Sequence, residues 1–575
     1  MIKYLLRPFV LFFKAALRLV LFVLLVLRRP VLIILALFIA AFLLATTLTL
    51  IAYYQGSAYT FDPLVAPFDK ASLTWGIIGI VLSLIFWIML EWVVPDGKKR
   101  PQAEQDTLQG GVVMPLRQKD LKNTFVWKTG HRRRAIVVRS PSQGVYVEGS
   151  AGAGKSQSVI EPIIEQAAAQ GFVGFLYDFK GHPPTLSSHL YGALSKHKPG
   201  VHFAHINLGD PAISQRCNPL AYLPTRLYAQ TYASVILKNL NREWATKTDF
   251  WAENAIAYLA AIIWYLKCHH PALCSLPHAT LLALELPAKS LRLLEQDEEV
   301  KRMIVAISVA HQQQAEKQLA GVFSSLQIPM NKLYTKELFW LLASQEEDAG
   351  HVHLDVSHPV RPTFLSVGND PRLGASFAPI IALLATVCMQ QMNQQGKHKS
   401  VFMLDEAPTL FIPGLEQLPA TARSNNLTTV LCVQDFAQLQ SLYGHKLAEV
   451  LRNNLGNQFF GMTGNLATGE YVAKMSGEYV GVRWSYTNSS ASSSDTASLG
   501  KEAYLTAHQV AAQPPGHFIV KVAGKRPEFF AAQLRAPSSA EKPIPVRIER
   551  NKLAGLMEEN WKKIHQEVEQ IVEGV

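Results

Sequence analysis

Residues 144–148 read GVYVE and residues 149–156 read GSAGAGKS, and this stretch decides the fold. The first segment predicts a short β-strand, and residues 156–170 (SQSVIEPIIEQAAAQ) have the pattern of a helix. A strand, a glycine-rich loop of the form G-x-x-x-x-G-K-[ST] and a helix in this order are typical of a P-loop. The sequence therefore predicts a phosphate-binding loop within an α/β domain.

The residue types in this loop suit ATP and Mg²⁺. Small residues let successive backbone N–H groups close around phosphates at the start of the helix. Lys155 is expected to reach the β- and γ-phosphates as a catalytic cation, and the Ser156 hydroxyl to ligate Mg²⁺. The predicted nucleotide contacts are Gly149, Ser150, Ala151, Gly152, Ala153, Gly154, Lys155, Ser156 and Gln157.

Two later strands carry polar residues at their ends. Residues 401–404 (VFML) are followed by Asp405 and Glu406, the pattern of a Walker B strand. Asp405 is expected to hold Mg²⁺, and Glu406 to orient or deprotonate the attacking water. The strand over 428–433 ends in Gln434, where a sensor of the γ-phosphate would lie.

The order of these segments predicts the fold class. Strands alternate with helices from 145 to 180 and from 362 to 464, which predicts a parallel sheet covered on both faces. Between Gly209 and Gly321 there is no glycine, and the apolar run 255–266 is too short to cross a membrane. We therefore expect an all-α domain inserted into an α/β domain.

The N-terminal residues predict membrane attachment. Residues 31–54 are uncharged and would form about 36 Å of helix, and the second apolar run, 73–94, carries one charge, Glu91. Basic residues flank the pair, which predicts two spans with both flanks and the bulk of the chain in the cytoplasm. Residues 1–30 present a basic helical face, so a helix on the inner leaflet is favoured over a third span. A partner-binding helix remains an alternative.

Charge gives weak evidence for nucleic acid. Residues 1–100 contribute +6 of the net +11, which leaves +5 for the remaining residues. A basic segment over 117–139 contains Phe125 and Trp127, and it could contact single-stranded DNA or, as we favour, anionic lipid. The Ser/Thr/Ala-rich residues 487–498 predict a mobile loop, and the last 30 residues a helical tail.

Several short motifs, in this order, resemble the type IV coupling proteins, the TraG/TraD-like ATPases of conjugation and type IV secretion. The resemblance covers about residues 25–535. Besides the P-loop and Asp405-Glu406, the matching residues are Asp178-x-Lys180-Gly181, Ala422-Arg423-Ser424, Gln434-Asp435, Gln438-Leu439 and Tyr443-Gly444. His182 departs from the family pattern, which usually has an acid there.

The resemblance implies a RecA-like fold and a homo-hexamer in the bacterial inner membrane. Such a ring recruits a DNA–relaxase complex, or effector proteins, to the channel of a type IV secretion system. By the resemblance Arg423 would be an arginine finger acting on a neighbouring subunit, Gln434 the sensor and Lys446 a second phosphate contact. A cation at a subunit boundary would neutralise charge in the transition state.

The sequence thus predicts six parts. They are an N-terminal helix (1–30), a transmembrane region (31–95), a first ATPase part (96–210), an all-α insert (211–350), a second ATPase part (351–540) and a C-terminal tail (541–575). The favoured function is a coupling ATPase that moves DNA. The alternatives are a coupling ATPase for protein effectors and a nucleotide-binding membrane scaffold without turnover.

Overall fold

The computed structural model of the chain describes residues 112–113, 123–130, 134–181, 185–489, 492–524, 528–538 and 541–574. The predicted helix over 1–30 and the predicted spans over 31–54 and 73–94 lie outside these residues. So do His182 and most of the basic side chains between 117 and 139.

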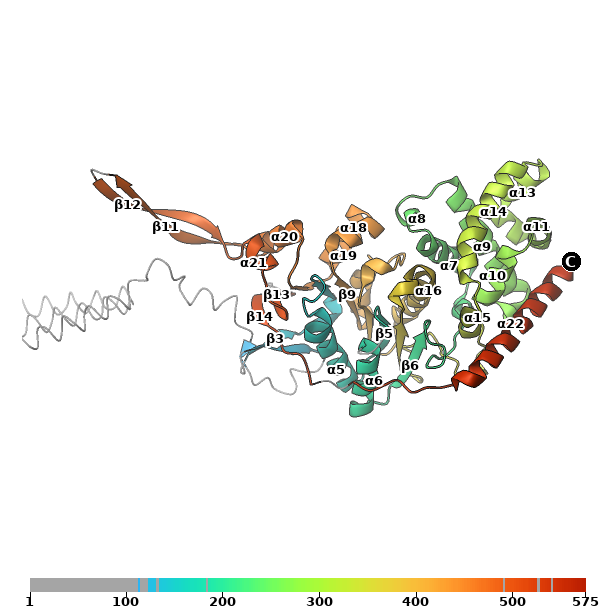
Figure 1. Cartoon of the computed structure of the whole chain (residues 1–575), viewed down its shortest axis with the longest axis horizontal. Helices are drawn as coiled ribbons and strands as arrows, with labels where there is room; N and C mark the ends of the chain where they lie inside the picture. The colour runs from blue at the N-terminus through green and yellow to red at the C-terminus, as the bar shows by residue number, and fades with distance from the viewer. Residues whose placement is uncertain are drawn as a thin grey trace, which may run out of the picture. The chain divides into compact units, whose positions relative to one another are not determined.

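A large sheet organises the described part of the chain (Figure 1). It has nine strands in the order β14-β13-β10-β4-β9-β8-β5-β7-β6. The run from β10 to β6 is parallel, whereas β13 and β14 pair antiparallel at one edge. The strands are β4 (Val145–Glu148), β5 (Val173–Asp178), β6 (His202–Asn207), β7 (Thr363–Gly368), β8 (Ser400–Leu404), β9 (Leu427–Val433), β10 (Asn457–Phe460), β13 (His517–Val522) and β14 (Glu528–Gln533).

Both faces of this sheet are buried, as expected for parallel strands. Val145 and Val147 of β4 pack in one apolar cluster with helices α5 (Glu161–Ala169) and α6 (Leu186–His197). Tyr146, between them, belongs to a second cluster that includes α16 (Gly374–Met392). Alternate side chains of one strand thus serve two cores, because successive side chains of a strand point to opposite faces.

A small antiparallel sheet lies against α5. Its strands are β1 (Val112–Val113), β2 (Phe125–Lys128) and β3 (Arg134–Val138), in the order β1-β3-β2. Phe125 and Trp127 are 0% and 1% exposed, and the indole of Trp127 donates a hydrogen bond of 3.2 Å to the Val159 carbonyl. Stacking of nucleic-acid bases on these two rings, one possibility raised by the sequence, is therefore wrong.

Between β6 and β7 the described residues form helices without strands. These are α7 (Arg226–Leu240), α8 (Glu243–Thr246), α9 (Phe250–His269), α10 (Leu276–Leu284), α11 (Pro287–Glu295), α12 (Glu298–Met303), α13 (Val305–Gln312), α14 (Glu316–Met330) and α15 (Lys336–Leu342). We call residues 217–341 the helical insert. The apolar run 255–266 lies in α9, whose first turn is capped by Asp249, and most of it is buried.

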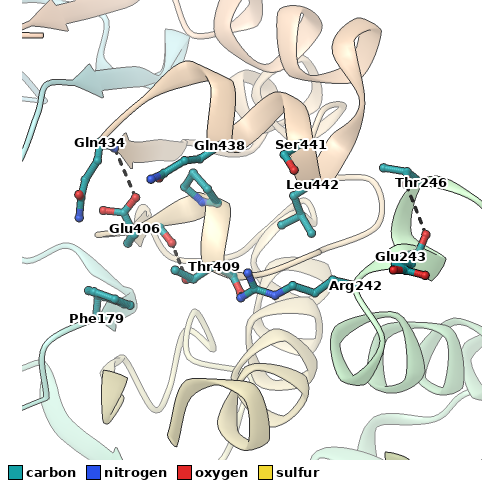
Figure 2. A pocket seen from close by; sticks show the side chains of 11 residues that line it. Phe179, Arg242, Glu243, Thr246, Glu406, Thr409, Gln434, Gln438, Ser441 and Leu442 are labelled. Carbon is teal, nitrogen blue, oxygen red and sulfur yellow. Dashed lines mark hydrogen bonds between the residues drawn. The ribbon is translucent and has the colours of Figure 1, made fainter. Parts of the chain in front are cut away.

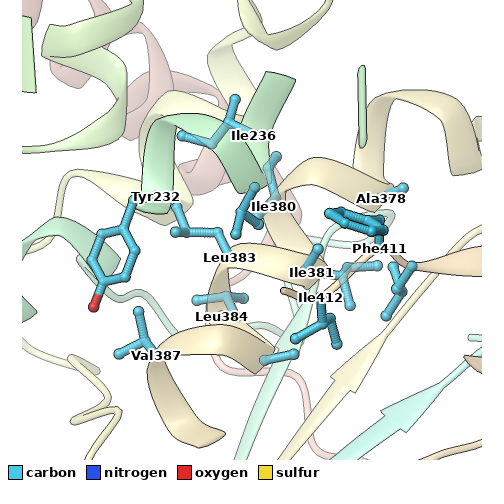
Figure 3. Packing of buried hydrophobic residues seen from close by; sticks show 14 of the residues in the cluster. Tyr232, Ile236, Ala378, Ile380, Ile381, Leu383, Leu384, Val387, Phe411 and Ile412 are labelled. Atoms are coloured by element: carbon cyan, nitrogen blue, oxygen red, sulfur yellow. The ribbon is translucent and has the colours of Figure 1, made fainter. Parts of the chain in front are cut away.

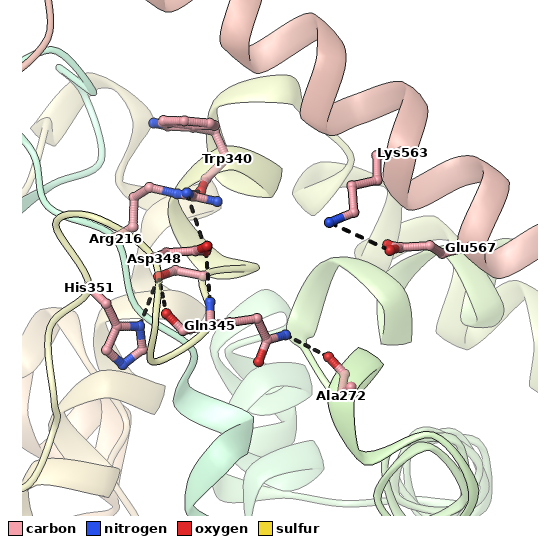
Figure 4. A network of polar contacts seen from close by, with 9 residues as sticks. Arg216, Ala272, Trp340, Gln345, Asp348, His351, Lys563 and Glu567 are labelled. Carbon is pink, nitrogen blue, oxygen red and sulfur yellow. Dashed lines mark hydrogen bonds and ion pairs between the residues drawn. The ribbon is translucent and has the colours of Figure 1, made fainter.

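The two ends of the helical insert are fastened to each other through Arg216 (Figure 4). Its guanidinium lies 3.9 Å from the ring centre of Trp340, donates to the Trp340 carbonyl at 2.8 Å and contacts Asp348 at 3.4 Å. The backbone adds hydrogen bonds from Cys217 to Leu341 and from Val352 to Arg216, both of 2.8 Å. The chain therefore enters and leaves the insert at one place.

Helix α16 is the one described helix long and apolar enough to cross a membrane. It packs against α7 and β5, and most of its side chains are buried inside the protein (Figure 3). Ile380, Leu383 and Leu384 of α16 face Tyr232 and Ile236 of α7 in this packing. Its apolar character is explained by this core position.

The described residues after β10 correct one expectation. After α20 (Leu466–Ser476), strands β11 (Glu478–Ser489) and β12 (Ser492–Ala503) pair antiparallel, with Glu478 opposite Ala503 and Ser489 opposite Ser492. The loop predicted over 487–498 is wrong for its described residues, because 487–489 end β11 and 492–498 belong to β12, where Asp495 lies opposite Tyr486 and Ala497 opposite Trp484. Helix α21 (Ala507–Ala511) follows the hairpin.

The C-terminal residues form helix α22 (Arg550–Glu573). It packs on the helical insert along α15 and α10 (Figure 1). The contact includes Trp561, whose ring centre lies 4.7 Å from that of Phe339, and a hydrogen bond of 3.0 Å between His278 Nε2 and Glu567 Oε2.

Candidate functional site

The site begins with the loop that follows β4. The amides of Gly149 and Ser150 donate to the carbonyls of Val433 and Met462, at 3.3 and 2.7 Å, which fixes the loop to its neighbours. Gly152 and Gly154 have φ values of 80° and 87°, a region in which glycine is strongly favoured. The helical turn Ser156–Ile160 (η3) and α5 follow, so the loop opens a helix as predicted.

Lys155 lies over this loop. Its ammonium donates to the carbonyl of Gly149 and, at 3.4 Å, to that of Ser150. Lys155 and Ser156 are half-buried, whereas Ala151, Gly152 and Gln157 are exposed. A cation and free backbone amides at a helix start form a cradle that fits phosphate oxygens.

Asp405 and Glu406 follow β8 and are 7% and 5% exposed. Burial, then the charges of Asp178 and Glu406, raise the pKa of Asp405 to about 7, while Lys155 acts to lower it. Burial likewise raises the pKa of Glu406, and Lys155 opposes that shift. These effects place the Lys155 ammonium within electrostatic reach of both carboxyls.

Gln434 completes the group of residues at this edge of the sheet. Strand β9 lies between β4 and β8. The backbone N–H of Gln434, the residue after β9, donates a hydrogen bond of 3.3 Å to Glu406 Oε1. Because the three strands are parallel, their carboxyl ends meet and bring Lys155, Glu406 and Gln434 together.

A cavity of about 540 Å³ opens beside Glu406 and Gln434 (Figure 2). One wall comes from the sheet edge and α18 (Phe436–Tyr443), and the other from α8 and the residue before it. The lining residues are Phe179, Arg242, Glu243, Thr246, Glu406, Pro408, Thr409, Gln434, Gln438, Ser441 and Leu442. The cavity thus separates the helical insert from the Glu406 carboxyl.

The oxygen donors present suit Mg²⁺. The Ser156 hydroxyl and the Asp405 carboxyl are hard ligands, and a Mg²⁺ ion held by few protein groups keeps positions for phosphate oxygens and water. Both residues lie at the ends of elements that the P-loop and β8 bring to the same edge.

Two other predicted site residues lie away from this group. Arg423 is exposed in the short helix η9 (Arg423–Asn425), which one residue separates from β9, and β9 spans about 23 Å. Within one chain Arg423 and Gln434 therefore lie at opposite ends of β9. Lys446 is exposed in the first turn of α19 (His445–Asn454), after α18 leads away from Gln434. The roles predicted for both stay predictions.

Sequence reasoning gave no role to Asp178, although its motif was noted. Asp178 ends β5, next to β8, and is 1% exposed. Its Oδ2 accepts hydrogen bonds of 2.8 and 2.7 Å from the amide and hydroxyl of Ser187. Gly181 has a φ of 66°, and a Cβ there would lie 1.5 Å from the Asn369 carbonyl oxygen. The glycine of this motif is thus required by a close backbone approach.

Sequence reasoning also missed Arg242 and Thr409. The Arg242 guanidinium donates to the Thr409 carbonyl at 3.2 Å, and the Thr409 hydroxyl donates to the Glu406 carbonyl at 2.6 Å. Arg242 and Thr409 are 167 residues apart, so no local pattern could have indicated their contact.

Comparison with known proteins supports the family resemblance. A family model described as "TraM recognition site of TraD and TraG" matches residues 399–515. The coupling protein TraD of Escherichia coli (strain K12) is 21% identical over 422 residues, which are 70% of this chain and 53% of TraD. The resemblance to type IV coupling proteins is confirmed. The chain spans about half the length of this curated relative.

Solved structures of the coupling protein TrwB share the fold. The unbound form matches with a TM-score of 0.55 and 15% identity over 72% of this chain and 90% of that one. TrwB in complex with the ATP analogue ADPNP matches with a TM-score of 0.53 and 16% identity, over 77% and 99%. TrwB with ADP and Mg²⁺ matches with a TM-score of 0.52 and 15% identity, over 79% and 94%. These likenesses confirm the α/β fold with its large, mostly parallel sheet.

Proposed function

We propose that this chain is a coupling ATPase of the bacterial inner membrane, which uses ATP hydrolysis to drive a DNA–relaxase complex into a type IV secretion channel. The observation that carries the proposal is the meeting of Lys155, Glu406 and Gln434 at the carboxyl ends of three neighbouring strands. The names of the relatives support the cargo: TraD and TrwB are both coupling proteins, and TrwB is described as conjugative.

The proposed chemistry assigns each residue a task. The loop of residues 149–157 surrounds the phosphates, which Lys155 and the loop amides not bonded to Val433, Met462 or Ser150 would hold. Ser156 and Asp405 would hold Mg²⁺, which neutralises charge on the phosphate oxygens. Glu406 orients the attacking water, and its raised pKa favours acceptance of a proton from that water. The side chain of Gln434, next to Glu406, senses the γ-phosphate.

The assembly is proposed from the resemblance. In a homo-hexamer Arg423 of one copy would reach the nucleotide of the next, and Lys446 would add a phosphate contact. The predicted spans over 31–54 and 73–94 would hold the ring in the membrane. Arg423 is exposed and precedes the amino end of β9, whereas the P-loop of the same chain follows the carboxyl end of β4. This position supports a role on a neighbouring copy.

The test is ATP hydrolysis by the full-length protein in detergent, with and without single-stranded DNA. Lys155→Ala and Glu406→Gln should each abolish turnover, with Glu406→Gln retaining binding of a fluorescent ATP analogue. Lys317→Ala and Glu316→Gln, two exposed residues at the start of α14, are matched controls.

The outcomes separate the candidate functions. Turnover that DNA stimulates supports the proposal, and turnover indifferent to DNA would favour protein effectors as cargo. Nucleotide binding with no turnover above the Glu406→Gln background would favour a scaffold and overturn the enzyme.

A further inference from the structure

The segment that follows Glu406 is held from several sides. Its first turn, η8 (Ala407–Thr409), is closed by the hydrogen bond from the Thr409 hydroxyl to the Glu406 carbonyl. The same hydroxyl lies 3.0 Å from the Tyr177 hydroxyl of β5, and the Tyr443 hydroxyl of α18 donates to the Leu410 carbonyl at 2.8 Å. We call residues 406–412 the Glu406 segment.

The helical insert is hydrogen-bonded to this segment through the last turn of α7. Asn239 is 5% exposed, and its amide group bonds both backbone groups of Phe411. Nδ2 donates to the carbonyl and Oδ1 accepts from the N–H, each at 2.8 Å. A side-chain amide paired in this way imitates a strand partner and fixes the backbone in both directions.

Arg242, two residues after α7, makes a second attachment. Its guanidinium donates to the Thr409 carbonyl and lines the cavity beside Glu406 (Figure 2). Lys238, on α7, has its ammonium 5.5 Å from the ring centre of Phe411. Phe411 and Ile412 lie beside Ala378 and Ile381 of α16 (Figure 3), in the same apolar cluster as Ile236 of α7.

These contacts have a direct geometric consequence. The cavity keeps the insert from the carboxyl of Glu406, so the insert reaches this residue through the backbone of residues 409–411. A displacement of α7 would therefore move the backbone that carries Glu406, while the P-loop on β4 is held by β9 and β10.

We propose that Asn239 and Arg242 are positioning residues through which the helical insert sets the place of Glu406. This inference rests on the proposed ATPase function for its kinetic consequence. Through these two residues the insert controls turnover without contacting the nucleotide. A partner that binds the insert therefore changes kcat for ATP hydrolysis and leaves the affinity for ATP unchanged.

The test compares Asn239→Ala and Arg242→Ala in the full-length protein with two controls. Asn254→Ala removes a half-buried asparagine whose amide bonds the Phe250 carbonyl within α9, and Arg226→Ala removes an exposed arginine at the start of α7. We expect each test variant to lower kcat by about tenfold, because small displacements of a catalytic group have large effects. KM for ATP and the affinity for a fluorescent ATP analogue should stay within about twofold.

Hydrogen–deuterium exchange gives a readout that does not depend on turnover. Exchange in residues 406–412 should be faster in both test variants and unchanged in the controls, with the P-loop peptide 149–160 unaffected throughout. Arg242→Ala keeps the test valid if the buried Asn239→Ala variant does not fold.

The proposal would be overturned if Arg242→Ala left both kcat and hydrogen–deuterium exchange in residues 406–412 unchanged. It would also be overturned if a test variant lost analogue binding and showed faster exchange in the P-loop peptide. If the unmodified protein does not hydrolyse ATP, the proposed function fails. Faster exchange confined to residues 406–412 would still support the positioning link.

Discussion

Asp178 ends strand β5, and Asp405 directly follows the neighbouring parallel strand β8. The charge of Asp178 is, after burial, the largest cause of the raised pKa of Asp405. Asp405 therefore ionises near neutral pH, at about 7, and Lys155 and Lys180 oppose the shift. A carboxyl must be ionised to bind Mg²⁺ well, so the acid–base state of Asp405 bears on the proposed ATPase.

The first prediction concerns Asp178→Asn. Removing the negative charge lowers the pKa of Asp405, since repulsion between two carboxylates disfavours the ionised form. The acid limb of the profile of kcat/KM against pH should move to lower pH. Mg²⁺-dependent binding of a fluorescent ATP analogue should shift in the same direction. An acid limb that stays in place would show that Asp178 does not influence Asp405.

The second prediction concerns His205 on β6. Burial lowers its pKa from 6.5 to about 4, and within the described residues neither ring nitrogen has a hydrogen-bond partner. The unfolded chain binds a proton on this ring below pH 6.5, whereas the folded chain does so below about pH 4. Stability is therefore lost as pH falls through this window.

His205→Leu should remove that dependence. Between pH 7 and pH 5 the unmodified protein should lose about 2 kcal/mol more free energy of unfolding than the variant. Chemical denaturation at both pH values measures this difference. Equal losses in the two proteins would contradict the prediction.

The third prediction compares Gly181→Ala with Gly200→Ala. Both glycines have positive φ, 66° and 76°, so both substitutions carry a backbone cost of about 1–2 kcal/mol. A Cβ at Gly200 meets no atom within 4 Å, whereas at Gly181 it would overlap the Asn369 carbonyl. Thermal unfolding should show Gly181→Ala as the more destabilised variant by several kcal/mol. Equal losses would mean that the backbone near Asn369 yields easily.

The fourth prediction concerns Arg452, which is 7% exposed on α19. Its guanidinium lies between two rings, 3.7 Å from the centre of Phe436 and 3.8 Å from that of Tyr471. Lysine keeps the charge but lacks the planar group that stacks on both rings. Arg452→Lys should cost about 1–3 kcal/mol in chemical denaturation, and the exposed control Arg226→Lys less than about 0.5 kcal/mol.

The site residues that directly follow a strand could be predicted from the sequence, because each group of them has its own short sequence pattern. The P-loop needs its glycines and lysine in one run, and Asp405-Glu406 and Gln434 each end an apolar strand. Parallel strands meet at one edge, so the sequence could also predict that these residues meet. The contacts of Asn239 and Arg242 depend on how the insert packs back over the sheet, which no local pattern encodes.

Two errors have physical causes of the same kind. The hairpin over 478–503 was missed because its second strand is made of residues with weak strand preference and depends on pairing with β11. The alternative that was not favoured, base stacking on Phe125 and Trp127, came from their basic neighbours. It fails because both rings are buried against the large sheet and α5.

The attachment of both ends of the helical insert to Arg216 has a consequence for how such proteins diversify. Residues 217 and 341 are joined by a backbone hydrogen bond, so the helices between them can differ in length or sequence without altering the strands on either side, provided that Asn239 and Arg242 keep their contacts with residues 409–411. Evolution can thus vary the outer helices of the insert and change the surface that they offer to other molecules, while the large sheet and the loop after β4 keep their arrangement.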